Sequence, residues 1–260
     1  MNNSTKKKVV ISDKVWLLIS LAAAMVLWYI LSIGDKTGRS FPFLEKVIPA
    51  VGTMIDRGAF WKDIKSSLTC VFSGFGLGFA TALPIAFLMA WYTPIQKIIE
   101  PWINFIRNIP ALGYAPLIVI IFGVGQKPAI ILIWICTFMT MSITIYQGIK
   151  NIDVTLIKAA RVLGANDFDI FLKVICPATV PFIITAVRLG ISVALTTLIA
   201  SESTGAVAGL GMRIKALSQV FENAEMMFYI IVVGVIGMLA EKILKFFERR
   251  LTSWQEKREI

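Results

Sequence analysis

The sequence predicts an all-α integral membrane protein with about six transmembrane helices. Hydrophobic residues make up 57% of its 260 residues and charged residues only 16%, whereas soluble domains are about half apolar and a quarter charged. The apolar residues gather in runs of about 20, the length that a helix needs to cross a bilayer. The charges lie mainly between these runs. We therefore expect one membrane domain over residues 15–250, between cytoplasmic tails at 1–14 and 251–260.

The apolar runs place the spans at residues 15–34, 65–91, 109–124, 129–149, 178–203 and 227–247. The first run follows Lys6–Lys8 and so resembles a secretory signal peptide, but it is too long for one and no A-x-A cleavage site follows it. We interpret it as a retained span. The third run contains Pro110 and Pro116, which membrane helices tolerate where neighbouring helices or water satisfy the freed backbone groups.

The basic residues predict that both termini are cytoplasmic. With that orientation, 16 of the 26 Lys and Arg residues fall in inner segments and 9 in outer segments, and Arg188 lies inside a span. Inner loops of membrane proteins carry the excess of basic residues. The net charge of +10 is spread over loops rather than clustered in a stripe, so nucleic-acid binding is not expected.

Three loops carry further information. Residues 35–64 mix apolar residues with charges, which favours an amphipathic helix at the membrane surface, and a plain connection is the alternative. Residues 92–108 form the first inner loop. Residues 204–225 contain three glycines and several charges, and they form either an outer docking surface or an ordinary surface loop.

The second inner loop predicts a helical hairpin over residues 153–176. Asp153 or Thr155 can begin its first helix, and Asn166 or Asp167 can begin its second, because these side chains cap helix N-termini. Gly164 is expected to end the first helix in the left-handed conformation that glycine adopts at little cost. Pro177 then ends the motif and begins the next span.

This loop resembles a motif of the permeases of bacterial ATP-binding-cassette (ABC) importers. Before their penultimate span these permeases carry Glu-Ala-Ala, three residues, Gly, nine residues and Ile-x-Leu-Pro. This chain has Ala159-Ala160, three residues, Gly164, nine residues and then Val-Ile-Cys-Pro ending at Pro177. The spacing matches throughout. Lys158 stands where the family has Glu, which reverses a charge.

The resemblance covers about residues 65–250 and is specific to the nitrate/sulfonate/taurine type. The stretches that carry it are EPWINFIRNIPALGYAPLIVIIFGVGQKPAII, PATVPFIITAVRLGISVAL, GLG and ERRL, at residues 100–131, 177–195, 209–211 and 248–251. It implies the MetI-like fold of type I importer permeases in the bacterial cytoplasmic (inner) membrane. It also implies a homodimer, flanked by two separate ATPase subunits and supplied by an extracytoplasmic solute-binding protein.

The resemblance implies a transport mechanism and a set of residues that couple it to ATP. The ATPases would receive the hairpin and drive alternating access, through coupling residues Lys158, Ala159, Ala160, Arg161, Gly164, Ala165, Asp167, Phe168 and Pro177. The substrate would be a small solute such as a sulfonate or taurine, nitrate or bicarbonate, or a vitamin precursor. A secondary transporter or channel subunit without an ATPase partner is the alternative function.

The sequence gives no sign of catalysis or cofactor binding. It has no His and only three scattered Cys residues, which removes the usual metal ligands and general bases. No GxxxxGK[ST] motif occurs, so ATP and Mg²⁺ should bind to the partner ATPase and not to this chain. We therefore expect a transport subunit and not an enzyme.

Polar residues within the spans are candidates for the translocation pathway. Arg188 and Glu202 lie fourteen residues apart, which places them on nearly one face of a helix, and Ser192 and Thr196 continue that face. A structural role for Arg188, bonded to a neighbouring helix, is the alternative. Thr140 and Thr144 in the fourth span could also line the pathway, or their hydroxyls could bond their own backbone.

Small residues recur every fourth position in the second span. Gly74, Gly78, Ala82 and Ala86 form a ridge of the kind that lets two membrane helices approach closely. This spacing predicts helix packing and not a glycine-rich nucleotide loop.

Overall fold

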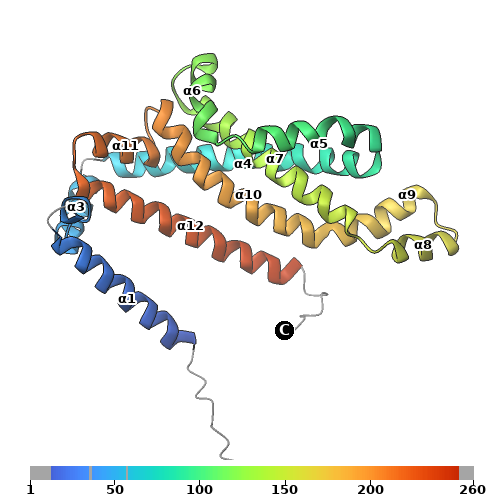
Figure 1. Ribbon diagram of the computed structural model, residues 1–260, viewed down its shortest axis with the longest axis horizontal. Coiled ribbons are helices and arrows are strands. Elements are labelled where there is room, and N and C mark those ends of the chain that lie inside the picture. Colours follow the sequence, from blue (N-terminus) through green and yellow to red (C-terminus); the bar gives the residue numbers. More distant parts are fainter. Residues whose placement is uncertain (1–12, 35–36, 57, 252–260) are drawn as a thin grey trace, which may run out of the picture.

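The computed structural model describes residues 13–34, 37–56 and 58–251, and Figure 1 shows their arrangement. The described residues form helices and no strands. The helices are α1 (Asp13–Ile33), α2 (Thr37–Ser40), α3 (Leu44–Asp56), α4 (Ala59–Trp91), α5 (Thr93–Arg107), α6 (Ala111–Phe122), α7 (Gln126–Lys150), α8 (Val154–Val162), α9 (Asp167–Ile170), α10 (Cys176–Gly205), α11 (Leu210–Gln219) and α12 (Asn223–Leu251). The tails expected at 1–14 and 251–260 lie almost wholly outside the described residues.

Within the described residues, five helices are long and apolar enough to cross a membrane. They are α1, α4, α7, the continuous segment Asp167–Gly205, and α12. The bent pair α5–α6 makes a sixth span if it is counted as one. The prediction of an all-α membrane protein with about six spans is confirmed.

The third span is placed differently from its prediction. Residues 92–108, expected as an inner loop, form the helix α5, which runs back along α4 in Figure 1. The predicted span 109–124 is mainly the 12-residue α6, which is bent by 100° from α5. Pro110 explains the break, because a proline disfavours the helical conformation in the residue before it. The charges of α5 favoured a loop in the prediction, but this segment is a helix that packs on α4 and α7.

The core of the bundle lies between α4 and α7, and α10 packs on the other side of α7. Ala82 and Ala86 are fully buried there. A Cβ added at Gly74 would lie 2.7 Å from Cβ of Ile133, and one added at Gly78 would collide with Thr137. The small-residue ridge therefore packs closely against another helix, as predicted, and the structure shows that this helix is α7.

The two ends of the bundle carry different structures. At one end the Gly125 N–H donates to the Gly205 carbonyl over 2.9 Å, and the Gln126 side chain donates to Ser66 Oγ over 2.9 Å. This is the outer end under the predicted orientation. The hairpin lies at the opposite end, beyond α4, α7 and α10 (Figure 1).

The first outer loop contains a helix. In α3 the residues Val47, Ala50 and Met54 are buried, and this face packs on α12 and α4. The helix α1 contacts the bundle far less and diverges from it in Figure 1. Its side chains are largely exposed, which leaves it free for lipid or a second chain to cover.

The ridge gives a stability prediction with a matched control on the same helix. Gly74→Ala should destabilise the protein by about 1–3 kcal/mol, because its new methyl group meets Ile133 and the backbone of α7. Gly76→Ala should be close to neutral, since nothing lies within 4 Å of a Cβ there. The thermal unfolding midpoint of the purified membrane protein measures both. Equal midpoints for the two variants would contradict the packing.

Candidate coupling site and transport pathway

The first helix of the hairpin begins and ends at the positions that its sequence predicts. Asp153, rather than Thr155, is the N-cap, and its Oδ1 accepts a hydrogen bond from Thr155 N–H over 2.8 Å. This bond lowers the pKa of the Asp153 carboxyl, which therefore stays ionised as a cap.

The turn of the hairpin depends on Gly164, which has φ +83°. Ala165 N–H donates to the Ala160 carbonyl, and Gly164 N–H donates to the Arg161 carbonyl, each over 3.0 Å. These two bonds form a Schellman motif, which needs a left-handed residue at the glycine position. The conformation of one residue thus sets the angle between the two halves of the hairpin.

The second half of the hairpin begins at Asn166, whose Oδ1 accepts from Asp169 N–H over 2.8 Å. Arg161 and Asp167 form an ion pair at 3.4 Å that joins the two halves. Both side chains are exposed, so this pair adds little stability, of the order of 0–1 kcal/mol. The capping bonds and the turn therefore define the hairpin more than this ion pair does.

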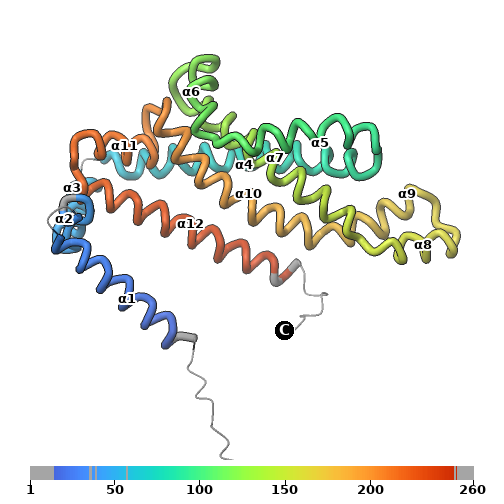
Figure 2. The backbone as a smooth tube through the Cα atoms, viewed as in Figure 1, coloured from blue at the N-terminus to red at the C-terminus, as the bar shows by residue number. Residues whose placement is uncertain are grey.

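Pro177 lies in the first turn of α10 and so begins the next span as predicted, but it does not separate that span from the hairpin. Residues Asp167–Gly205 form one continuous segment, in which a π-helical turn, Phe171–Ile175, joins α9 to α10 (Figure 2). A proline lacks an N–H, and its ring clashes with the carbonyl four residues earlier in a regular helix. The wider π turn accommodates Pro177, so the hairpin is joined to α10 without a break.

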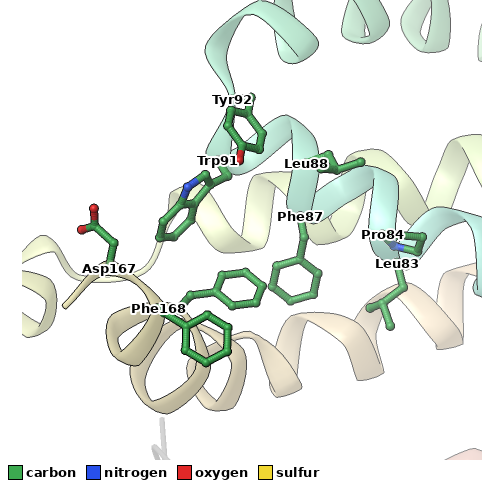
Figure 3. Close-up of a pocket in the computed structure, with 9 residues that line it drawn as sticks. Leu83, Pro84, Phe87, Leu88, Trp91, Tyr92, Asp167 and Phe168 are labelled. Carbon is green, nitrogen blue, oxygen red and sulfur yellow. The ribbon is translucent and has the colours of Figure 1, made fainter. Parts of the chain in front are cut away.

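The base of the hairpin packs on the inner ends of α4 and α7. The Phe171 ring contacts those of Phe87 and Trp91 edge to face, with centroids 5.4 Å apart in both pairs. Beside these rings lies an open groove of ≈ 690 Å³, in which Phe168 of α9 faces α4 (Figure 3). Ile170 and Ile175 are buried against the end of α7 and neighbouring residues.

The far side of the hairpin is an exposed apolar surface. Val162 and Leu163 are 87% and 86% exposed there, whereas Phe168, which faces α4, is 71% exposed beside the groove. Of the other predicted coupling residues, Lys158, Ala159, Arg161, Gly164, Asp167 and Pro177 are exposed, and Ala160 and Ala165 are partly buried. Lys158 makes no ion pair within the described part of the chain. Exposed apolar side chains of this kind make the hairpin a candidate interaction surface.

The predicted pathway residues of α10 fall into two environments. Arg188 pairs with Glu248 of α12. Ser192 and Thr196 lie exposed on α10, and their hydroxyls donate to carbonyls one turn earlier in that helix. Glu202 does not join them, because it is only 1% exposed and bonds to other elements.

Glu202 belongs to a buried set of polar residues at the outer end, which we call the outer network: Asp63, Ser67, Glu202, Arg213, Tyr229 and the backbone of residues 208–211. Glu202 accepts hydrogen bonds from Ser67 Oγ over 2.7 Å and from Gly211 N–H over 2.8 Å. Ser67 Oγ in turn accepts from Leu210 N–H over 2.8 Å. These bonds fix the loop after α10 on α4.

Asp63 is the second buried carboxylate of the outer network and is fully buried. It accepts hydrogen bonds from Arg213 Nε at 2.8 Å, Gly209 N–H at 3.1 Å and the Tyr229 hydroxyl at 3.3 Å. The Asp63 carboxylate raises the pKa of the Arg213 guanidinium above its ordinary value. Sequence reasoning missed Asp63, because nothing in its local pattern shows that it meets residues about 150 positions away.

Thr140 and Thr144 of α7 are partly buried. Their hydroxyls donate to the carbonyls of Cys136 and Thr140, over 3.0 Å and 2.7 Å. Both bonds stay within α7. The hydroxyls therefore bond their own backbone, which is the alternative to lining the pathway. A search of the described residues finds no group of three or more His, Cys, Asp and Glu that could hold a metal ion.

Comparison with known proteins identifies the family. Residues 74–253 match the model of the binding-protein-dependent transport system inner membrane component. The chain belongs to this family. A probable ABC transporter permease of Brucella abortus (strain 2308) is 39% identical over 92% of this chain and 95% of its own length.

Further relatives of this permease define its type. The taurine transport system permease protein TauC of Escherichia coli (strain K12) is 31% identical over 81% of this chain and 77% of its own length. The nitrate import permease protein NrtB of Leptolyngbya laminosa is 29% identical over 79% of this chain and 74% of its own length. The resemblance to the nitrate/sulfonate/taurine type is thus confirmed.

Solved structures agree on the fold. A structure of the MetNI methionine ABC transporter in inward-facing conformations gives a TM-score of 0.67 at 20% identity, over 75% of this chain and 96% of that one. An amino acid ABC transporter gives 0.63 at 22% identity, over 77% and 97%. The chain is therefore a multi-pass inner-membrane permease of an ABC importer with the MetI-like fold, and its relatives are transport subunits rather than enzymes.

The outer network gives a second stability prediction. Asp63→Asn should destabilise the permease by about 3–5 kcal/mol, because it leaves Arg213 without its charged partner. Asp56→Asn, at an exposed position of α3, should change stability by less than about 0.5 kcal/mol. Thermal unfolding measures stability, and limited proteolysis of the 206–211 loop reports its release. A loop that stays resistant in Asp63→Asn would refute the proposed role of Asp63.

Proposed function

We propose that this permease forms half of a translocation pathway and alternates between inward- and outward-facing states, driven by a separate ATPase that docks on the hairpin. The observation that carries the proposal is the continuous segment Asp167–Gly205. Its 39 residues span about 58 Å at 1.5 Å per residue. A displacement of the docked hairpin is therefore transmitted along α10 to the outer network.

The exposed apolar tip of the hairpin supports an ATPase as its partner. Val162 and Leu163 are among the most exposed apolar side chains of the described residues, and their burial in a groove of another subunit would remove this surface from water. ATP and Mg²⁺ would bind in that subunit, so this chain would carry no cofactor. Docking of an ATPase on the hairpin also gives a reason for the continuous helical segment Asp167–Gly205 that joins the hairpin to α10.

The outer end supports docking of a solute-binding protein. Under the predicted orientation, the loop and helix after α10 face outward. Val207 and Phe221 are 70% and 82% exposed there, and exposed charges such as Lys215 and Glu222 lie nearby. An apolar centre with charged neighbours is typical of a protein–protein interface.

A second copy of the permease completes the pathway in this proposal. The helices α1 and α12 leave wide apolar faces exposed, which a second copy could cover. The relatives named for taurine and nitrate transport support a small anionic or zwitterionic solute as the substrate. Bicarbonate and vitamin precursors are alternatives of similar size.

Docking is tested by two substitutions at Gly164. Gly164→Val should strain the turn, because a β-branched residue does not adopt a left-handed conformation readily, and the ATPase should no longer co-purify. Gly164→Asn should keep the ATPase, because asparagine tolerates this conformation. A steric clash would not cause the loss of the ATPase in Gly164→Val, since nothing lies within 4 Å of a Cβ at this position. Full ATPase recovery and uptake with Gly164→Val would contradict the proposal and favour a transporter that needs no ATPase.

Lys158 provides a separate test of the same surface. Because its side chain is exposed and makes no ion pair within the described residues, Lys158→Glu should change ATPase binding by only about 0–1 kcal/mol, as for a surface charge. The dissociation constant of the detergent-solubilised complex measures this change. Complete loss of assembly would instead show that Lys158 pairs with an acidic group of the ATPase.

A further inference from the structure

The open groove of ≈ 690 Å³ at the base of the hairpin, which we call the hairpin groove, lies between the inner end of α4 and α9. Its α4 wall is apolar and aromatic, and Phe168 and Phe171 line it from the hairpin side (Figure 3). Its volume falls within the range of about 300–1,000 Å³ that is typical of ligand pockets. Val162 and Leu163, the exposed tip offered to an ATPase, do not line this groove.

The residue types along the hairpin groove follow the change of polarity across one leaflet of a membrane. Leu83 and Pro84 lie at one end of the groove, and Asp167 lies at the other (Figure 3). Trp91 and Tyr92 lie between them, and such aromatic residues are enriched where a membrane meets water. From Leu83 to Trp91 the helix rises about 12 Å at 1.5 Å per residue, close to the about 15 Å of hydrocarbon in one leaflet. The groove therefore extends from acyl-chain depth to the headgroups.

A pair of opposite charges lies at the headgroup end of the hairpin groove. The Asp167 carboxylate lines the groove, and its Oδ1 is 3.4 Å from Nη2 of Arg161. The two side chains are 74% and 66% exposed. The neighbouring Asp169 is instead held by Lys173 at 2.6 Å. Because a long, exposed ion pair contributes little stability, Asp167 and Arg161 can each exchange their partner for a charged group of a ligand.

These features fit a phospholipid whose headgroup carries charges of both signs. A phosphate matches Arg161, an ammonium group matches Asp167, and an acyl chain matches the apolar part of the groove. Anionic lipids typically bind to clusters of several basic residues, whereas this groove presents one charge of each sign. A purely anionic headgroup would bring negative charge beside the Asp167 carboxylate without a compensating ammonium group.

We propose that the hairpin groove binds one phosphatidylethanolamine molecule of the inner leaflet, with its ammonium on Asp167 and its phosphate on Arg161. One acyl chain lies along residues 83–91 of α4. The bound lipid contacts α4 and the hairpin together and fills the space between them. This inference goes beyond the proposed transport function, because the lipid is neither the transported solute nor a protein partner.

Native mass spectrometry of the full-length permease, alone and purified with its ATPase, measures lipid binding. Palmitoyl-oleoyl phosphatidylethanolamine should bind at lower concentration than phosphatidylglycerol with the same chains. Asp167→Asn should weaken phosphatidylethanolamine binding about two- to fivefold, as for an exposed ion pair, and should not weaken phosphatidylglycerol binding. Asp169→Asn is the matched control, because Asp169 pairs with Lys173 and does not line the groove. Equal effects of the two variants, or no preference for phosphatidylethanolamine in the unchanged protein, would overturn the proposal.

The apolar wall of the groove is tested by filling it. Leu88→Trp should weaken the binding of both lipids, because Leu88 is exposed in the groove and the indole would occupy it. Leu77→Trp, at an exposed position of α4 that does not line the groove, should leave both unchanged. Unchanged lipid binding with Leu88→Trp would overturn the proposal. If that variant instead loses its ATPase, the groove receives the ATPase, and if the unchanged dimer retains no lipid, a second copy covers it; either result also overturns the proposal.

Discussion

One unbroken series of helical hydrogen bonds connects the hairpin of this permease to its outer network. In a bilayer every backbone N–H and carbonyl must find a partner within the protein. Pro177 would interrupt that series near the inner end of α10, but the π-helical turn Phe171–Ile175 carries the helix through. The hairpin therefore cannot move independently of α10. Arg188 and Glu202 both lie on this same helix.

The outer network holds four helices together at the outer end of the bundle. Asp63 of α4, Glu202 of α10, Arg213 of α11 and Tyr229 of α12 meet within one set of hydrogen bonds. Buried charges without partners are strongly destabilising, so this arrangement favours a single position of the four helices. The outer loop is consequently part of the folded core and not a flexible connection between spans.

Local physical rules predicted the hairpin well and the long-range contacts poorly. Asp153, Gly164 and Asn166 act through bonds to residues a few positions away, so capping preferences sufficed to place them. The membrane class and the α4–α7 ridge also followed from composition and spacing. The partnership of Asp63 with Arg213 depends on how distant helices dock, which no local pattern encodes.

Two errors at the hairpin end have a common physical cause. The prediction for α5 relied on charges, which usually end a membrane span, and the prediction for the segment around Pro177 relied on a proline, which usually ends a helix. In the structure, packing outweighs these local preferences. The face of α5 that includes the buried Ile103 packs on α4 and α7, and Phe171 rests on Phe87 and Trp91. Burial of apolar surface stabilises helices that local sequence alone would not.

The geometry of α10 and α12 connects the hairpin to the contacts between these two helices. The two helices are held together at the outer end, where Tyr229 of α12 and Glu202 of α10 share the outer network. Toward the inner end they are joined by the Arg188–Glu248 pair. If an ATPase displaces the hairpin, α10 turns about the fixed outer end, and the separation from α12 changes most where the lever arm is longest. Glu248 lies close to the inner end of α12, so its bond to Arg188 is among the first contacts to change. A movement of the hairpin would therefore change the Arg188–Glu248 pair before it changes the outer network.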